Sequence, residues 1–313
     1  MEHDTPEVAL TIGVFDGVHR GHQDLVRRMV ESARRAGLAA HCITFDPDPE
    51  AFLRPERPPK ALTDPGERSS LLRDLGVECV EVVPFDAAVA SETAEQFLRD
   101  VSQRCRPRQI WVGEDFALGH DRAGTVPVIR ELGRSMGFDV TSVPLLMHAG
   151  RPISSSWVRS ALASGDVGLA ERLLGRPYTI SGIVEPGARR GRLLGFPTAN
   201  VSPPPGRALP ADGVYFVMVT VTSSPDGPDP SPTQRRFGVV NLGGRPTFDE
   251  AERLLETHIL DFAGDLYGAR LAVSFLAQLR GTQRFASIDE LRLQIDRDVD
   301  RARKLVAERS ERS

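Results

Sequence analysis

The segment Thr11-Ile-Gly-Val-Phe-Asp-Gly-Val-His-Arg-Gly-His22 joins a run of apolar residues to an amphipathic stretch. Residues 8–14 are almost all apolar, which predicts a buried strand, and from about Gly21 apolar residues recur with helical spacing. The N-terminus of a helix offers unpaired N–H groups and the positive end of the helix dipole. A strand that passes through a glycine-containing turn into a helix therefore predicts an α/β fold with a phosphate site at the turn.

The same alternation continues to about residue 145. Short apolar runs typical of buried strands are separated by amphipathic stretches with helical periodicity. The expected strands are 39–45, 77–83, 109–112 and 139–143, and the expected helices are 67–75, 93–103 and about 126–136. Repeated strand–helix–strand units predict a parallel sheet with helices on both faces.

The pattern changes after about residue 175. Strand-like runs separated by Gly- and Pro-rich turns are expected at 177–184, 213–222, 236–242, 255–260 and 270–279, followed by one helix at 287–309. These runs predict a small closed β-barrel with a C-terminal helix. We therefore expect two domains, 1–175 and 176–313, and we expect a fragment of residues 176–313 to fold alone. Residues 223–234 contain four prolines and predict a solvated loop.

Composition narrows the class of protein. The 39 Lys and Arg residues against 43 Asp and Glu residues give a formal net charge of −4, whereas a nucleic-acid-binding protein normally carries a basic stripe. The chain has no apolar run long enough to cross a membrane, and its first residues lack the pattern of a signal peptide. Three cysteines without CxxC spacing fit a reducing compartment. We expect a cytoplasmic protein with neither nucleic acid nor membrane as a partner.

His19 and His22 are the first candidate catalytic residues. Two histidines at the start of a helix can donate hydrogen bonds or carry positive charge toward a phosphorus centre, and Gly13, Gly17 and Gly21 let the backbone approach a ligand. The alternative is a helix start with incidental histidines. The whole string GVFDGVHRGH resembles the HxGH nucleotidyltransferases, and it is similar to the prokaryotic riboflavin kinase/FAD synthetase family in particular.

The resemblance extends to two later segments of the first domain. Residues 111–119, WVGEDFALG, resemble the VGxDFxFG segment of that family, and residues 153–159, ISSSWVR, resemble its ISSTxxR segment, although a serine-rich run can also be a helix cap. The resemblance implies a Rossmann-like adenylyltransferase domain in which His19 and His22 are catalytic. It implies these ATP-binding residues: Gly13, Phe15, Asp16, Gly21, Gly113, Asp115, Ser155, Ser156 and Arg159.

A second phosphate site is expected at Gly187-Ala-Arg-Arg-Gly-Arg-Leu-Leu-Gly-Phe-Pro-Thr-Ala-Asn200. Glycines and arginines in a turn can wrap a polyphosphate, while Thr198 and Asn200 supply the hard oxygen ligands that Mg²⁺ prefers. A basic surface turn is the alternative, but GFPTAN resembles the riboflavin kinase signature. The resemblance implies a Greek-key β-barrel kinase domain with Thr198 and Asn200 as metal ligands. Its implied ATP-binding residues are Gly187, Arg192, Gly195, Thr198 and Asn200.

The remaining kinase residues also follow from the resemblance. Residues 245–248 and 256–262 resemble further kinase motifs, and these imply that Glu256 is the general base for the ribityl 5′-hydroxyl. Arg280 and Phe285 lie in the region that covers the flavin in relatives. The expected function is ATP-dependent phosphorylation of riboflavin to FMN and adenylylation of FMN to FAD, with Mg²⁺ as cofactor and small molecules as substrates.

The first domain departs from the family pattern at four positions. Asp48 stands where the family has histidine, Ala117 and Leu118 replace arginine and phenylalanine, and Trp157 adds bulk. Asp48 either repels bound phosphates or caps the following turn. Two other functions therefore stay open: a riboflavin kinase with an impaired or substrate-shifted first domain, and a flavin- or nucleotide-binding regulatory protein without turnover.

Overall fold

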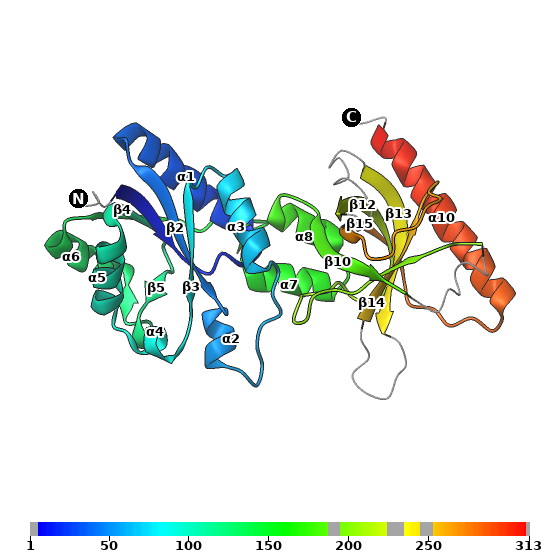
Figure 1. Cartoon of the computed structure of the whole chain (residues 1–313), viewed down its shortest axis with the longest axis horizontal. Helices are drawn as coiled ribbons and strands as arrows, with labels where there is room; N and C mark the ends of the chain where they lie inside the picture. Colours follow the sequence, from blue (N-terminus) through cyan, green and yellow to red (C-terminus); the bar gives the residue numbers. More distant parts are fainter. Residues whose placement is uncertain (1–5, 187–194, 224–234, 245–252, 311–313) are drawn as a thin grey trace. The chain divides into compact units, whose positions relative to one another are not determined.

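The computed structural model describes residues 6–186, 195–223, 235–244 and 253–310 (Figure 1). The chain divides into two compact units, Met1–Ser155 and Ser156–Ser313. No helix among these described residues is long and apolar enough to cross a membrane.

The first unit contains the predicted parallel sheet. Its strands are β1 (Glu7–Ile12), β2 (Ala39–Asp46), β3 (Cys79–Pro84), β4 (Arg106–Gly113) and β7 (Asp139–Val143), in the order β3-β2-β1-β4-β7 and all parallel. From β1 the chain adds β2 and then β3 on one side of the sheet. It then adds β4 and β7 on the other side of β1. The loops that follow β1 and β4 therefore diverge, and a parallel sheet binds ligands at such a switch point.

Helices cover both faces of this sheet (Figure 1). Helices α1 (Arg20–Ala36) and α3 (Pro65–Asp74) pack on the face that carries Ala9 of β1, while α5 (Ala94–Arg104) and α6 (Val126–Met136) pack on the face that carries Leu10. Successive residues of a strand point to opposite faces, so β1 supplies both cores. The predicted Rossmann-like architecture is confirmed.

Several short elements surround the sheet and were not predicted. They are the helices η1 (Asp16–Val18), α2 (Pro49–Leu53), α4 (Ala87–Ser91) and η2 (His120–Arg122), and the two-stranded pairs β5 (Ala117–Leu118) with β6 (Gly124–Thr125) and β8 (Met147–His148) with β9 (Arg151–Pro152). Strand β1 is also shorter than expected, because Phe15, Gly17 and Val18 have positive φ values and turn the chain away from the sheet.

The second unit contains a closed antiparallel barrel in the order β10-β11-β14-β13-β12-β15. Its strands are β10 (Tyr178–Glu185), β11 (Ala199–Val201), β12 (Gly213–Ser223), β13 (Arg235–Gly244), β14 (Arg253–Ile259) and β15 (Arg270–Gly281). The barrel is confirmed with one strand more than the five expected, since the three residues of β11 are too few to show a period of two. The predicted loop at 223–234 lies outside the described residues except for Ser223, which ends β12.

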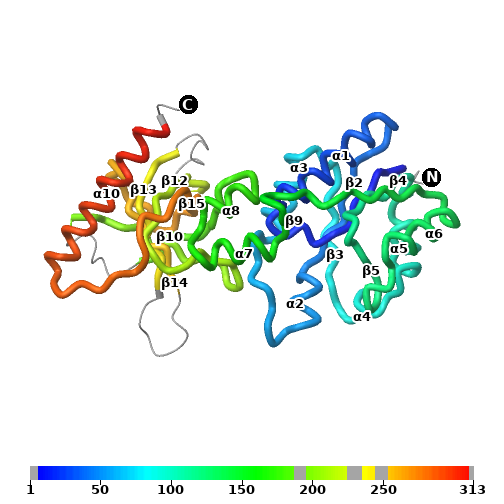
Figure 2. Tube along the Cα trace, turned by 180° about the vertical axis from the view of Figure 1, so that it is seen from behind, coloured from blue at the N-terminus to red at the C-terminus, as the bar shows by residue number. Residues whose placement is uncertain are grey.

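The C-terminal helix α10 (Ile288–Ser310) lies against the barrel, beside β13 (Figure 2). Val299 and Ala302 of this helix join the core formed with Phe216 of β12. Two polar contacts fix its position: the Arg280 Nε atom lies 2.9 Å from an Asp298 carboxylate oxygen, and Arg301 Nη1 donates to the Leu279 carbonyl at 2.6 Å. The predicted C-terminal helix is therefore an integral layer of this unit.

Two further helices, α7 (Ser155–Ala163) and α8 (Val167–Leu174), precede the barrel. Ala211 N donates to the Leu162 carbonyl at 2.8 Å, and α8 contacts β10 and β15. Gly165 allows a close approach, because a Cβ atom there would lie 2.8 Å from the Gln278 amide nitrogen. Contacts thus divide the chain near Ser155, and the domain boundary at residues 175 and 176 stays a prediction.

These contacts predict that helix α8 stabilises the barrel against unfolding. A fragment of residues 156–313 keeps Leu173 and Leu174 buried against the barrel, whereas a fragment of residues 176–313 loses both side chains. Burial of one leucine contributes about 1.5–3 kcal/mol. We therefore expect the free energy of unfolding of the shorter fragment to be at least about 2 kcal/mol lower than that of the longer one. Urea unfolding of both fragments, followed by circular dichroism, measures this difference. Equal midpoints would show that α8 adds nothing to the barrel.

Candidate functional site

A cavity of about 960 Å³ lies in the first unit, at the carboxyl ends of the central strands. Its walls come from the turn after β1, the segment after β4, helix α2 and the segment before α7. The structure brings nine of the predicted residues to this cavity: Gly13, Phe15, Asp16, His19, Gly21, His22, Gly113, Asp115 and Ser155. Ser156 and Arg159 belong to the second unit, and their ATP-binding roles stay predictions.

The turn after β1 is held by the carboxylate of Asp16, which is only 4% exposed. Its oxygens accept hydrogen bonds from Leu62 N at 2.9 and 3.0 Å, from Thr63 N at 2.9 Å and from the Thr63 hydroxyl at 3.1 Å. The carbonyl of Asp16 accepts a hydrogen bond from the Ser155 hydroxyl at 2.9 Å. Asp16 therefore joins three distant segments, and its predicted role in binding ATP stays a prediction.

A buried arginine fixes the same turn from the other side. Arg68 of α3 donates to the Val14 carbonyl at 2.8 Å and to the Phe45 carbonyl at 3.0 Å. Val14 lies two residues beyond the end of β1, and Phe45 is the next-to-last residue of β2. One guanidinium group therefore donates hydrogen bonds to carbonyls at the ends of two adjacent strands. Arg68 was not among the predicted site residues, because a single charged residue in a helical stretch is usually solvated.

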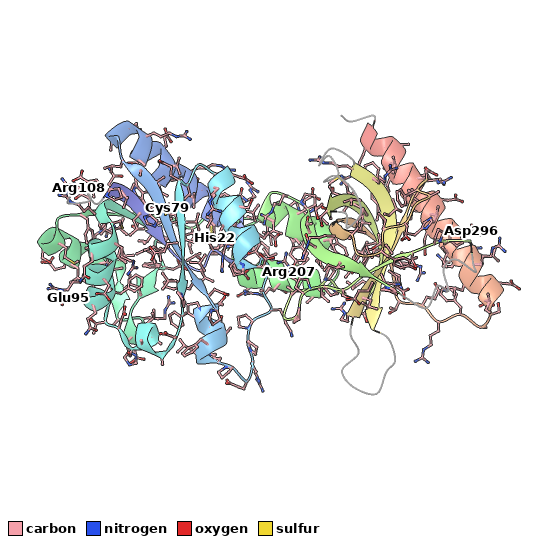
Figure 3. All side chains as sticks on the ribbon, in the orientation of Figure 1. His22, Cys79, Glu95, Arg108, Arg207 and Asp296 are labelled. Atoms are coloured by element: carbon pink, nitrogen blue, oxygen red, sulfur yellow. The ribbon has the colours of Figure 1, made fainter. Side chains whose placement is uncertain are left out.

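His19 and His22 lie against each other at the start of α1. His22 is labelled in Figure 3, and the two rings stack with centroids 3.6 Å apart and an interplanar angle of 18°. Because His19 Nδ1 accepts a hydrogen bond from His22 N at 3.3 Å, a neutral His19 carries its proton on Nε2. Gly21 makes this packing possible, since a Cβ atom there would lie 3.1 Å from His19 Cε1.

His22 is held neutral in this arrangement. Burial, the neighbouring His19 and the Arg68 guanidinium keep the pKa of His22 well below its usual value. Its Nδ1 atom is buried and has no hydrogen-bond partner among the residues that the structure describes. An anion that enters the cavity would favour the protonated form of this ring.

Apolar side chains form another wall of the cavity. They are Phe45, Leu53, Phe85, Val89, Phe97, Phe116 and Leu118. Phe85 makes edge contacts with Phe45 and Phe52, at 5.7 and 5.6 Å between ring centroids. Phe45 and Phe97 were expected only as parts of a strand and a helix, because periodicity cannot distinguish a side chain in a core from one that lines a cavity. The cavity can hold a flat apolar ring system as well as phosphates.

Asp48 caps the short helix α2. Its Oδ1 atom accepts a hydrogen bond from Glu50 N at 2.8 Å. Within the described chain, Pro49, Glu50, Leu53 and Arg54 line the cavity and Asp48 does not. The structure therefore supports the capping role rather than a carboxylate directed at bound phosphates.

The candidate kinase site lies on three neighbouring barrel strands. Glu256 of β14 stands opposite Asn200 of β11 and opposite Asn241 of β13. Residues opposite each other in antiparallel strands share a face, and Asn241 Nδ2 lies 3.5 Å from Glu256 Oε2. Asn241 was not among the predicted site residues, since only the barrel register places it beside Glu256.

The segment before β11 is tied to the same strand. His258 Nδ1 lies 2.9 Å from the Pro197 carbonyl, and the Phe196 ring meets the His258 ring edge-on at 5.6 Å. These contacts and the pairing of Asn200 with Glu256 hold the predicted signature against β14. Gly187, Arg192 and the motif at 245–248 lie outside the described residues.

The oxygen atoms of Thr198 and Asn200 are of the kind that a hard cation prefers. The barrel register places Asn200 opposite Glu256, the candidate base. No group of three or more His, Cys, Asp or Glu side chains able to hold a metal occurs among the described residues. A cation here would therefore also need oxygens from a phosphate or from water.

Arg280 and Phe285 lie together at the end of β15. The Arg280 guanidinium is 5.6 Å from the centre of the Phe285 ring, and it pairs with Asp298 of α10. This contact explains how Arg280 is oriented, while the predicted role of both residues in binding flavin stays a prediction.

Comparison with known proteins covers almost the whole chain. Residues 1–157 match the FAD synthetase family, and residues 174–306 match the riboflavin kinase family. The bifunctional riboflavin kinase/FMN adenylyltransferase of Escherichia coli (strain K12) is 41% identical over 295 residues, covering 94% of this chain and 91% of the relative. The protein of the same description from Bacillus subtilis (strain 168) is 34% identical, covering 96% and 93%.

A solved structure is also similar along its length. A crystal structure described as a macrolide-efflux protein from Streptococcus pneumoniae has 31% sequence identity and a TM-score of 0.85. The similarity covers 96% of each chain. The fold is therefore shared across both units.

The lowered pKa of His22 predicts a pH-dependent stability of the first unit. Below about pH 6.5 the unfolded chain binds a proton that folded His22 does not, so folding becomes less favourable as the pH falls. We expect the stability of the parent chain relative to a His22→Gln variant to fall by up to about 1.4 kcal/mol between pH 7.5 and 5.5. Urea unfolding followed by Trp111 fluorescence, in a Trp157→Phe background, measures it. A difference independent of pH would contradict the neutral state of His22.

Proposed function

The chain belongs to the family of bifunctional riboflavin kinase/FMN adenylyltransferases, and we propose that each of its two reactions is carried out by a separate compact unit. It phosphorylates riboflavin to FMN with ATP, and it transfers the AMP group of a second ATP to FMN to make FAD. The observation that supports the division of labour is the gathering of the predicted nucleotidyltransferase residues around one cavity of the first unit.

We propose that adenylyl transfer takes place beside His19 and His22. An FMN phosphate oxygen attacks the α-phosphorus of ATP, the bond to the β-phosphate breaks, and pyrophosphate leaves. The attacking oxygen is already an anion, so the reaction needs positioning and charge stabilisation more than it needs a base. The Nε2–H of His19, the ring of His22 and the N-terminus of α1 would supply that stabilisation. The apolar wall with Phe85, Phe116 and Leu118 suits the flavin ring.

Riboflavin phosphorylation is proposed at Glu256. Its carboxylate takes the proton of the ribityl 5′-hydroxyl, that oxygen attacks the γ-phosphorus of ATP, and ADP leaves. Asn241 orients one carboxylate oxygen through the 3.5 Å contact, and the other oxygen stays available as the proton acceptor. Thr198 and Asn200, with ATP phosphates, would hold Mg²⁺, which when bound neutralises charge on the transferred phosphoryl group.

A cytoplasmic location is proposed from the cysteines. Cys42, Cys79 and Cys105 are free thiols, and two of them are buried. Burial raises the pKa of Cys105 to about 11, so it stays a protonated, unreactive thiol. Unpaired cysteines of this kind suit a reducing compartment, where small molecules are the expected partners.

The two activities are expected to separate by mutation. Glu256→Gln should lower FMN formation by roughly 10²–10⁴-fold, because an amide cannot accept the hydroxyl proton, while added FMN is still converted to FAD. His19→Ala combined with His22→Ala should abolish FAD formation and leave FMN formation intact. Chromatography of riboflavin, FMN and FAD over time measures both reactions.

A matched control is Glu308→Gln, which alters an exposed carboxylate of α10. It should change neither reaction. Near-normal kinase turnover in Glu256→Gln would remove Glu256 as the base, and normal FAD synthesis in the double histidine variant would remove the first unit's cavity as the adenylyltransferase site.

The capping contact of Asp48 predicts the effect of restoring histidine. Asp48→His should not accelerate FAD synthesis, and it should weaken α2 by about 1 kcal/mol because the N-cap acceptor is lost. Asp48→Asn keeps an acceptor oxygen and should behave like the parent chain. Initial rates at limiting and saturating ATP test this. Faster FAD synthesis by Asp48→His would show that the carboxylate repels bound phosphates.

A further inference from the structure

The cavity of the first unit is lined by two guanidinium groups, those of Arg54 and Arg122. Arg54, the C-cap residue of α2, already pairs with Glu50 of that helix, with Nη1 3.3 Å from Oε1. The Arg122 guanidinium meets the Asp115 carbonyl, with Nη2 at 3.3 Å, and among the described residues it has no carboxylate partner. Arg122 is therefore a cation at this cavity whose charge remains unmatched.

The substrates of adenylyl transfer need such a cation. Both carry phosphate groups, whereas the described lining residues include the carboxyl groups of Glu50, Asp115 and Asp121, which repel anions. His22 adds no positive charge of its own to the cavity, because burial lowers its pKa. A guanidinium group offers several donors in a planar arrangement that matches phosphate oxygens.

Arg122 is presented by a turn with an unfavourable backbone conformation. Asp121 and Arg122 have φ values of 54° and 55°, in the left-handed region that side chains disfavour. Residues in such conformations persist where surrounding contacts hold them, and they concentrate at ligand sites. The turn belongs to the hairpin of β5 and β6, so it lies between Leu118 and Gly124.

Surrounding contacts hold this turn in place. His120 N donates to the Glu92 carbonyl at 2.7 Å, and Arg122 N donates to the Gly119 carbonyl at 3.0 Å. Gly119 packs directly on the start of α5, where a Cβ atom would lie 2.5 Å from Ala94 N. The position of Arg122 at the cavity is thus determined by the fold before a ligand binds.

We propose that Arg122 is a substrate-binding residue of the adenylyltransferase site, where its guanidinium group binds a phosphoryl group of a bound substrate. The proposal rests on the proposed function of the first unit. The phosphoryl group belongs either to the triphosphate of ATP or to the 5′-phosphate of FMN.

Steady-state kinetics on the full-length chain test the proposal. For Arg122→Ala, kcat/KM of FAD formation from FMN and ATP should fall by about 10- to 100-fold, as expected for loss of one charged hydrogen-bonding group. Arg122→Lys, which keeps the charge, should recover most of this loss. Riboflavin phosphorylation, measured in the same preparations, should not change. Arg134→Ala, which removes an exposed arginine of α6 paired with Glu131, is the matched control and should not affect either reaction.

The variant Arg122→Gly separates binding from folding. Glycine adopts a φ of 55° without strain, so the melting temperature should stay equal or rise while FAD synthesis falls as in Arg122→Ala. A higher KM for FMN alone would identify the FMN phosphate as the ligand. A higher KM for ATP with weaker inhibition by pyrophosphate would identify the triphosphate.

Two outcomes distinguish failure of this proposal from failure of the proposed function. Unchanged kcat/KM for both substrates in Arg122→Ala and Arg122→Gly, with a parent chain that makes FAD, would overturn the role of Arg122 alone. A parent chain that makes no FAD from FMN and ATP would overturn the function of the first unit and this proposal with it.

Discussion

The buried carboxylate of Asp16 determines how the chain leaves the central strand, and the first site depends on that turn. Four hydrogen bonds from Leu62 and Thr63 hold the carboxylate, while Arg68 binds the carbonyls of Val14 and Phe45 from the opposite side. Positive φ values in the turn would otherwise be unfavourable. These contacts aim the N-terminus of α1 and its two histidines into the cavity.

The two units place their functional groups by different physical means. In the first, the parallel strand order reverses at β1 and β4, so diverging loops open a cavity at the strand ends. In the second, antiparallel register places Asn200 and Asn241 beside Glu256. A change of one residue in that register would move every side chain to the other face of the barrel. Backbone hydrogen bonding thus arranges the candidate kinase site, whereas loop anchoring arranges the candidate adenylyltransferase site.

Both candidate sites must bind phosphate-rich substrates, although the chain has a net charge of −4. The protein does not meet this need with an overall positive field. The groups that the first cavity offers are local: the N-terminus of α1, His22 with its lowered pKa, and Arg122 on a turn with positive φ values. Local placement of this kind makes each charge effective only at its own cavity.

The sequence by itself determined the two-part fold class, and nine of the residues that it nominates for the first site line one cavity of the structure. Apolar residues that recur every two or 3.6 positions indicate long elements such as β12 and α1. The motifs around His19 and Asn200 can be recognised because their polar residues lie close together in the sequence. Only the tertiary structure decided the contacts of Asp48, Arg68, Arg122 and Asn241, the sixth barrel strand β11, and the grouping of α8 with the barrel. Each of these depends on partners that the sequence pattern leaves unspecified, because folding brings together hydrogen-bond donors, acceptors and apolar surfaces from separate segments.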